Sequence, residues 1–313
     1  MGKAVKIFLV LALLVSVGGF TMSVVTAQEA GLSVTEVADM VKSNMKKMNM
    51  GIFISEYNDV KENLSIQSQG EITKLVILTT FPDVAIQQGG SELVVHLDGD
   101  VSSELRDLLS EKRLGKTAYI KIASVFNESP SSRGLNATII VPDGIEQIKV
   151  TSISGSILVD EIELEQLDLE SQSGTIEVMN SEAERLTAQT RSGHISVFGC
   201  EDVAVDLASA SGDVITKVGK ISGSMVTKSG ALNVDFVELT EDLTLKSESG
   251  LINIMYQGDD VVYDFSNSEG WVKNSSANSN LRQGSIGTGT YHLRAKSISN
   301  GIIFTYTQDE IHN

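Results

Sequence analysis

The stretch Ser-Gln-Ser-Gly-Thr-Ile-Glu-Val, residues 171–178, places a Ser-Gly pair in front of an alternating run of apolar and polar residues. A serine near a glycine occurs in nucleophile elbows and phosphate-binding loops, and it also occurs at turns between strands. A catalytic serine is single in a chain, whereas a structural corner can recur. The rest of the sequence therefore decides between chemistry and architecture.

The Ser-Gly pair recurs along the chain at a nearly constant interval. Its six copies are Ser154-Gly155, Ser173-Gly174, Ser192-Gly193, Ser211-Gly212, Ser229-Gly230 and Ser249-Gly250. The steps between them are 19, 19, 19, 18 and 20 residues. A repeat of this length cannot bury its own apolar face, but stacked copies share a continuous core. The pairs are therefore interpreted as structural corners of a stack.

Alignment of the copies on the serine shows which positions face inward. Counted from the serine of each pair, apolar residues occupy even positions before it and odd positions after it. Leu169, four residues before Ser173, and Ile176 and Val178, three and five residues after it, are examples. Alternate residues of a strand face the same side, so the phase shifts by one residue at the corner. We expect the glycine to permit this bend through a positive φ.

A second column holds only small hydroxyl side chains, two positions before each serine. These residues are Ser152, Ser171, Thr190, Ser209, Thr227 and Ser247. We expect them to form an internal ladder near the corner, bonded to one another or to corner backbone. The predicted fold is all-β: a single-stranded, β-helix-like β-solenoid with coils of about 19 residues.

The same register continues less regularly outside the six copies. Residues 75–86 fit it with Phe81-Pro82 in place of Ser-Gly, and residues 263–272 fit a degenerate coil with Glu269 at the serine position. Residues 293–303 fit a last coil if Asn300 is a single inserted residue.

Further strands are predicted in the N-terminal half at residues 92–97, 117–124 and 136–142. Residues 102–116 are expected to form a loop or a short helix, and the polar stretch 274–289 a surface loop.

The N-terminus carries a targeting segment. Lys3 and Lys6 precede an apolar run, and cleavage after Ala27 or retention as a membrane anchor are both consistent with it. Residues 33–50 are predicted to form a short amphipathic helix that packs over an open end of the solenoid or touches a membrane. The predicted parts are 1–27 (signal or anchor), 28–51 (linker and helix), 52–145 (irregular β portion) and 146–313 (regular repeats and cap).

Composition limits the partners. The formal net charge of −17 and a pI near 4.6 repel the phosphate backbone, so nucleic acid is excluded as a partner. Cys200 is the one cysteine, so no intramolecular disulfide can form. Membrane contact is expected only through the N-terminal segment.

The repeated S-x-S-G-x-I-x-V pattern after an export signal resembles the bacterial putative-adhesin family of exported β-strand-repeat proteins, whose domain has unknown function. The resemblance covers residues 60–305, and Pro82 departs from the usual glycine corner. It implies a solenoid fold, export and a role at the cell surface or in the periplasm. It supplies no catalytic residue.

No catalytic, cofactor-binding or metal-binding residue is predicted. The six serines have changing neighbours and no base partner, and the four histidines lack the spacing of a zinc helix. Asp98-Gly-Asp100 is interpreted as a hairpin turn because the later carboxylates of a calcium loop are missing. Cys200 has no assignable base and is interpreted as an incidental thiol.

Four outward residues on neighbouring coils are candidates for surface binding: Arg191, His194, Asp213 and Lys228. We expect a non-enzymatic envelope protein, an adhesin or a surface binding or scaffold module, whose partner is an envelope protein or a cell-surface polymer. One alternative is a β-helix enzyme acting on acidic polysaccharide, with Arg191, Asp213, Lys217 and Lys228 as candidates. The other is a scaffold that self-associates end to end through unpaired strand edges.

Overall fold

A computed structural model describes residues 57–66, 72–102, 108–122, 132–275 and 282–307. The chain divides into two units, Met1–Glu56 and Tyr57–Asn313, and every described residue belongs to the second. The predicted targeting segment and the predicted helix at 33–50 lie outside the described residues. Within the ranges given above, no helix is long and apolar enough to cross a membrane.

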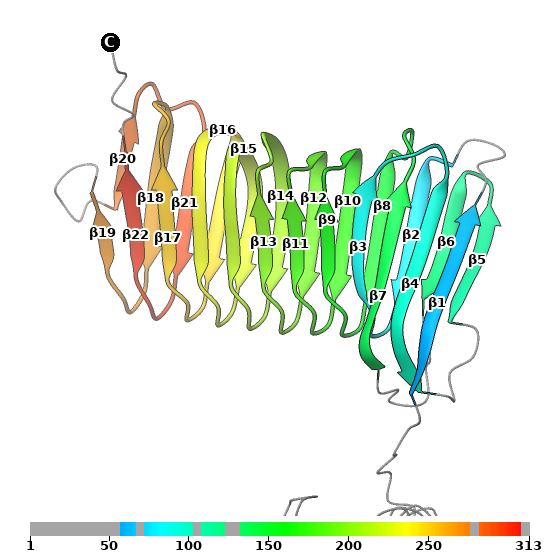
Figure 1. The fold of residues 1–313 in the computed structure, drawn as a ribbon. Coiled ribbons are helices and arrows are strands. Elements are labelled where there is room, and N and C mark those ends of the chain that lie inside the picture. The colour runs from blue at the N-terminus through cyan, green and yellow to red at the C-terminus, as the bar shows by residue number, and fades with distance from the viewer. Residues whose placement is uncertain (1–56, 67–71, 103–107, 123–131, 276–281, 308–313) are drawn as a thin grey trace, which may run out of the picture. The chain divides into compact units, whose positions relative to one another are not determined.

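The described chain is a stack of β-coils (Figure 1), which confirms the predicted all-β solenoid class. Each regular coil contributes one strand before its Ser-Gly corner and one after it. The pre-corner strands are β8 (Gln147–Ser152), β10 (Glu163–Ser171), β12 (Glu182–Thr190), β14 (Asp202–Ser209) and the second halves of β15 (Val214–Thr227) and β16 (Leu232–Ser247). The post-corner strands are β9 (Ile157–Asp160), β11 (Ile176–Met179), β13 (Ile195–Phe198), the first halves of β15 and β16, and β17 (Ile252–Tyr256).

Neighbouring coils pair in parallel and keep the repeat interval. Leu167 lies opposite Leu186 in the pre-corner sheet, and Ile176 lies opposite Ile195 in the post-corner sheet. The core lies between the two sheets, where Leu167, Ile176 and Ile195 are fully buried. The predicted change of phase at the corner is therefore confirmed.

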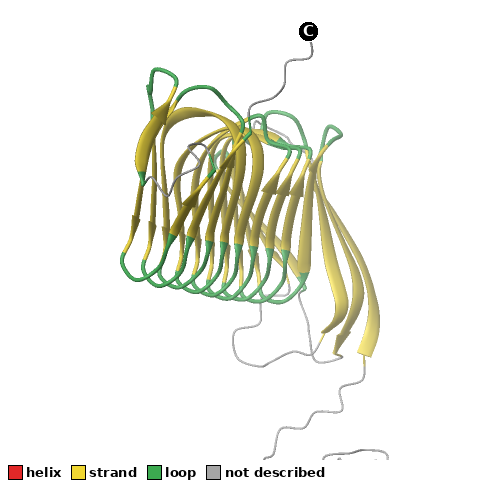
Figure 2. Ribbon diagram, turned by 90° about the vertical axis from the view of Figure 1, so that its left-hand side faces the viewer, coloured by secondary structure: helices red, strands yellow, loops and turns green. Residues whose placement is uncertain are grey.

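Glycine is required at the corners for a reason other than the one the sequence suggested. None of the six corner glycines has a positive φ, so the expectation of a left-handed bend was wrong. A Cβ added at Gly212 would instead lie 1.8 Å from the carbonyl oxygen of Gly193, and one at Gly174 would lie 2.1 Å from that of Gly155. The corners stack too closely for any side chain, and Figure 2 shows them as a row of matching arcs along one edge.

The hydroxyl column forms the predicted ladder. The Oγ of Ser209 accepts a hydrogen bond from the Gly212 N–H at 2.8 Å and donates one to the Gly193 carbonyl at 3.0 Å. Thr190 and Thr227 make the same pair of bonds with their own corner and the preceding one. Each of these three hydroxyls therefore pairs the buried N–H of its own corner with the buried carbonyl of the preceding corner. Ser171 and Ser247 accept the N–H of their own corner glycine, and Ser152 donates to the carbonyl of its own Gly155.

The coil whose corner is Phe81-Pro82 shows what the ladder requires. Thr79 occupies the hydroxyl column, but the residue three positions later is Pro82, which has no N–H to donate. The Thr79 hydroxyl is buried and has no hydrogen-bond partner. This coil nevertheless keeps the register, since Val84 pairs with Ile157.

At the N-terminal end, the spatial order of the coils differs from their order in the sequence. Strands β2 (Lys74–Thr79) and β3 (Asp83–Gln88) lie next to β8 and β9. Strands β6 (Thr117–Ile122) and β7 (Ser132–Val141) pair on their other side, although they come later in the sequence. The antiparallel strands β1 (Tyr57–Ile66), β4 (Leu93–Ser102) and β5 (Leu109–Leu114) complete this end.

Two local expectations at this end are corrected. The predicted loop or helix at 102–116 includes strand β5, which forms a hairpin with β6. The Asp98-Gly-Asp100 sequence is not a hairpin turn, because it lies within β4 at a bulge.

The C-terminal end is reordered in the same way. Strands β21 (His292–Ser297) and β22 (Ile302–Tyr306) insert between β16 and β17 on one side and β18 (Val261–Asn267) and β19 (Val272–Asn274) on the other. The last coil in the sequence is thus the second-to-last in space. Asp242 joins it to the coil before, because it accepts hydrogen bonds from the Arg294 guanidinium at 2.7 Å and the His292 N–H at 2.9 Å.

Two further expectations are corrected here. Asn300 is not inserted, because Ile302 pairs with Ile252 while Ser297 pairs with Ser247; Asn300 therefore occupies the corner-glycine position. The predicted surface loop 274–289 contains β20 (Gln283–Ile286), which pairs antiparallel with β18.

The corner stacking predicts a steep penalty for one methyl group. Gly212→Ala should lower the free energy of unfolding by about 3 kcal/mol, because its Cβ overlaps a backbone carbonyl that cannot move alone. Gly89→Ala is the matched control, since the nearest atom to its Cβ lies 3.7 Å away. Urea titration of both variants measures the difference, and equal stabilities would contradict the stacking constraint.

The hydroxyl ladder predicts that the substitution Thr→Val has opposite effects on stability at two buried positions. Thr227→Val leaves the Gly230 N–H and the Gly212 carbonyl unpaired in the interior and should cost about 2 kcal/mol. Thr216→Val removes a buried hydroxyl that has no partner and should stabilise by about 1 kcal/mol. Thermal unfolding of both variants measures the change in stability. If both substitutions changed the stability in the same direction, the ladder hydrogen bonds would not explain the effect.

Candidate binding surfaces

The four residues predicted for surface binding lie along the corner edge. His194 and Asp213 come from consecutive coils and lie together: the His194 Nδ1 is 3.7 Å from an Asp213 carboxylate oxygen and accepts the Asp213 N–H at 3.0 Å. The Asp213 carboxylate in turn accepts the Ala231 N–H at 2.7 Å. These two side chains therefore bond the backbone of the next coil, a structural role that the sequence did not indicate.

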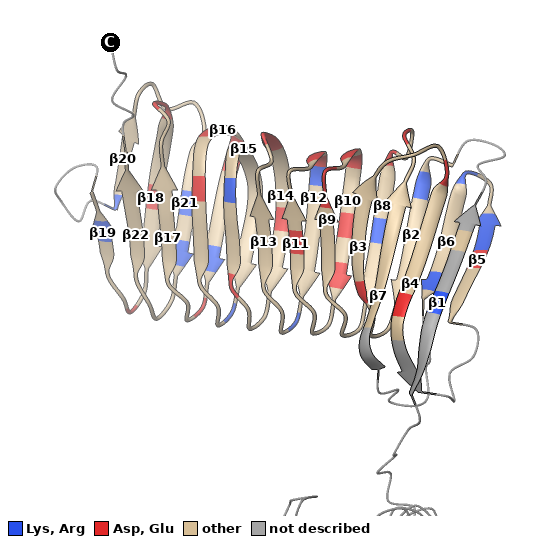
Figure 3. Ribbon diagram, in the orientation of Figure 1, with Lys and Arg blue, Asp and Glu red and all other residues tan. Residues whose placement is uncertain are grey.

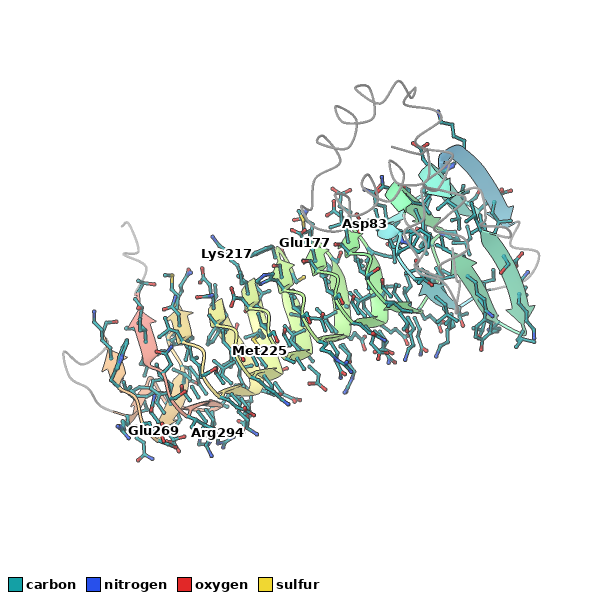
Figure 4. All side chains as sticks on the ribbon, turned by 90° about the horizontal axis from the view of Figure 1, so that it is seen from below. Asp83, Glu177, Lys217, Met225, Glu269 and Arg294 are labelled. Carbon is teal, nitrogen blue, oxygen red and sulfur yellow. The ribbon has the colours of Figure 1, made fainter. Side chains whose placement is uncertain are left out.

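Arg191 and Lys228 lie on the same edge but are not brought together. Both side chains are exposed, and the coil that carries Ala210 separates them. Lys217, a candidate of the enzymatic alternative, lies on the outer face of the post-corner sheet with Glu177 (Figure 4). The corner edge thus gathers no cluster of acid, base and nucleophile from these candidates.

Cys200 lies inside the stack. It is only 3% exposed, and its thiol contacts the carbonyl of Phe198 at 3.8 Å. Burial raises the pKa of the thiol. A nucleophilic cysteine needs a lowered pKa and access to substrate, so the interpretation as an incidental thiol agrees with its surroundings.

The opposite edge, where the return loops run, carries a groove of about 1190 Å³. We name it the return-loop groove. Its walls come from successive levels of the stack, from the loop 143–146 through 163–165, 182–185, 201–204 and 222 to 240–241. The groove therefore runs along the axis of the solenoid and crosses the coils.

The return-loop groove is strongly acidic. Nine carboxylates line it: Asp143, Glu146, Glu163, Glu165, Glu182, Glu184, Glu201, Asp202 and Glu241. Arg185 is the one basic residue of the lining. Figure 3 shows this concentration of acidic residues at the upper ends of β10, β12 and β14. Its formal charge is thus −8, out of −17 for the whole chain.

The sequence analysis did not single out this groove, although part of its signal was present. Glu163, Glu182 and Glu201 are spaced by 19 residues, the period of the Ser-Gly pairs. A column of like charges at the repeat interval indicates a charged stripe once the stack is recognised. The groove itself depends on how the loops curve, and no residue pattern predicts that.

The metal-ligating side chains in the described part of the chain are dispersed. No group of three or more His, Cys, Asp or Glu side chains there is arranged to hold a metal ion. The carboxylates of the groove are distributed along it and do not converge on one point.

The fold and its corners define the class of protein: a single-stranded β-solenoid built from short coils. The profile of the Toastrack DUF4097 family matches residues 72–302, and the chain belongs to that family. No curated protein matches the chain by sequence.

Two solved structures share the fold. A putative lipid-binding protein from Parabacteroides distasonis is 16% identical, with a TM-score of 0.52 over 79% of this chain and 97% of that one. A putative adhesin from Bacteroides fragilis is 13% identical, with a TM-score of 0.50 over 79% of this chain and 97% of that one. At these identities the similarity shows the fold alone.

The position of Cys200 predicts its reactivity. Because burial raises the pKa of the thiol and covers it, a disulfide reagent should react with it slowly at mildly alkaline pH in the folded protein. The reaction should become fast and stoichiometric in concentrated guanidinium. Absorbance of the released thiolate follows both rates, and rapid reaction of the folded protein would make the thiol a functional candidate again.

Proposed function

We propose that this protein is a non-enzymatic binding module of the cell envelope, exported to the cell surface or the periplasm. The observation that carries the proposal is the return-loop groove, which concentrates nine carboxylates on a rigid stack. Its partner is an envelope protein or a cell-surface polymer. An adhesin-like role agrees with the similarity of the fold to the putative adhesin from Bacteroides fragilis.

The acidity of the groove favours binding over cleavage of acidic polysaccharide. A polyanionic substrate would be repelled from a groove of formal charge −8. None of the residues considered for that reaction lines the groove, and the Asp213 carboxylate accepts the Ala231 N–H.

End-to-end self-assembly is disfavoured by the edge strand β5. Its central residues are Glu111, Lys112 and Arg113, and charged side chains on an edge strand oppose pairing with another strand.

Introduced cysteines test both export and binding, because the native Cys200 is buried and gives little background. We expect Thr240→Cys, in the groove lining, to be labelled in intact cells by a membrane-impermeant maleimide. Carrying a thiol-linked photo-cross-linker, it should also yield a saturable adduct with a partner.

Ser192→Cys, exposed on the corner edge, is the matched control. It should be labelled equally but yield no such adduct. Absence of labelling at both positions in intact cells contradicts display at the cell surface, and absence of labelling after release of the periplasm contradicts export. Equal cross-linking at both positions contradicts the groove as the binding surface.

A further inference from the structure

The return-loop groove holds like charges in direct register. Glu163 and Glu182 are paired residues of β10 and β12, and adjacent strands lie about 4.8 Å apart. Glu201 follows Glu182 at the same 19-residue interval. Like charges directly opposite each other destabilise a sheet. The unbound groove therefore carries an electrostatic penalty that a ligand with several positive charges would relieve.

Ser222 is a second, independent indication of a ligand. It is only 4% exposed and lies on the groove wall near its C-terminal end. Its hydroxyl makes no hydrogen bond with another described side chain or backbone group. Unlike the sealed hydroxyls of Thr79 and Thr216, it borders the groove. The Ser222 hydroxyl is therefore open to the groove and free to bond with an acceptor brought by a ligand.

Arg185 narrows the chemistry of that ligand. Its guanidinium has donors only and makes no ion pair with a described residue. The ligand must therefore offer acceptors for Arg185 and Ser222 as well as cations for the carboxylates. A polypeptide offers both, since its carbonyls accept hydrogen bonds and its lysine and arginine side chains donate them. A polyamine offers donors alone, and a single metal ion requires carboxylates that converge.

The dimensions fit an extended segment. Six levels of the stack at about 4.8 Å per step span roughly 24 Å. An extended chain covers about 3.3–3.6 Å per residue, so roughly seven residues fill this length. The volume of about 1190 Å³ lies above the usual range for small-molecule sites.

From these observations we propose that the return-loop groove binds an extended lysine- and arginine-rich segment of a partner protein, laid along the axis of the solenoid. This inference rests on the proposed binding function and specifies its partner. The carboxylates pair with the basic side chains, while Ser222 and Arg185 hold backbone carbonyls of the segment.

The test titrates the exported chain with a fluorescent peptide of about eight residues that alternates lysine and serine. Anisotropy should show saturable binding that weakens as salt is added. The same peptide with acetylated lysines should not bind. Glu182→Gln with Glu184→Gln should weaken binding about tenfold, and Ser222→Ala about fivefold.

The double variant Glu170→Gln with Glu248→Gln is the matched control, because it removes the same charge outside the groove lining. It should leave the affinity unchanged. The groove variant should also melt at a higher temperature than the parent, since it relieves the repulsion. This readout shows that lost binding is not lost folding.

Each other outcome overturns the inference. Tighter binding of spermine or of a chitosan oligomer of equal charge identifies a polyamine or an amino-sugar polymer as the ligand class. If the groove variant and the control variant lose equal affinity for the peptide, the binding depends on net charge alone and not on the groove. If Thr240→Cys still captures a partner in cells while the peptide fails to bind, the binding function stands and the basic segment is wrong. If both fail, the groove is not a binding surface.

Discussion

Each corner glycine rests on the carbonyl oxygen of the corner one coil away, so closely that no side chain fits between them. This approach is possible because the hydroxyl column satisfies the buried N–H and carbonyl groups of the same corners. Glycine and hydroxyl are therefore two parts of one constraint: the first permits the contact and the second removes its polar cost. The in-register sheets and the continuous core follow from the spacing that this contact imposes.

The corner edge and the return-loop edge differ in how strongly this stacking constraint fixes their residues. Along the corner edge even polar side chains are used to bond backbone, as His194 and Asp213 show. The return-loop edge has no such ladder, so its loops can vary in length and β15 and β16 can run across it as continuous strands. The acidic groove lies on this less constrained edge. The corner edge is thus fixed by the stacking of the coils, whereas the return-loop edge is free to vary in shape and charge.

Both ends of the stack depart from sequence order. Strands β2 and β3 are covered by a coil that comes later in the chain, and the final coil is inserted beneath β18 and β19. Each insertion gives the inserted strands a neighbour on both sides. The terminal levels are finished by antiparallel strands such as β5 and β20.

Repetition made the core of this fold predictable from residues alone. The Ser-Gly interval, the hydroxyl column and the shift of the apolar phase specify strand, corner and stack, since each is a local pattern copied six times. Segments that are not copies of the repeat could not be placed in this way. The position of the last coil, the place of Asn300 and the strand β5 depend on pairing with distant segments. The reason glycine is needed also emerged only in three dimensions, because a missing Cβ and a positive φ look identical in a sequence. The return-loop groove was not predicted for a similar reason. Its glutamates stand in the sequence at the repeat interval, but only the stacking of the return loops makes them walls of one surface.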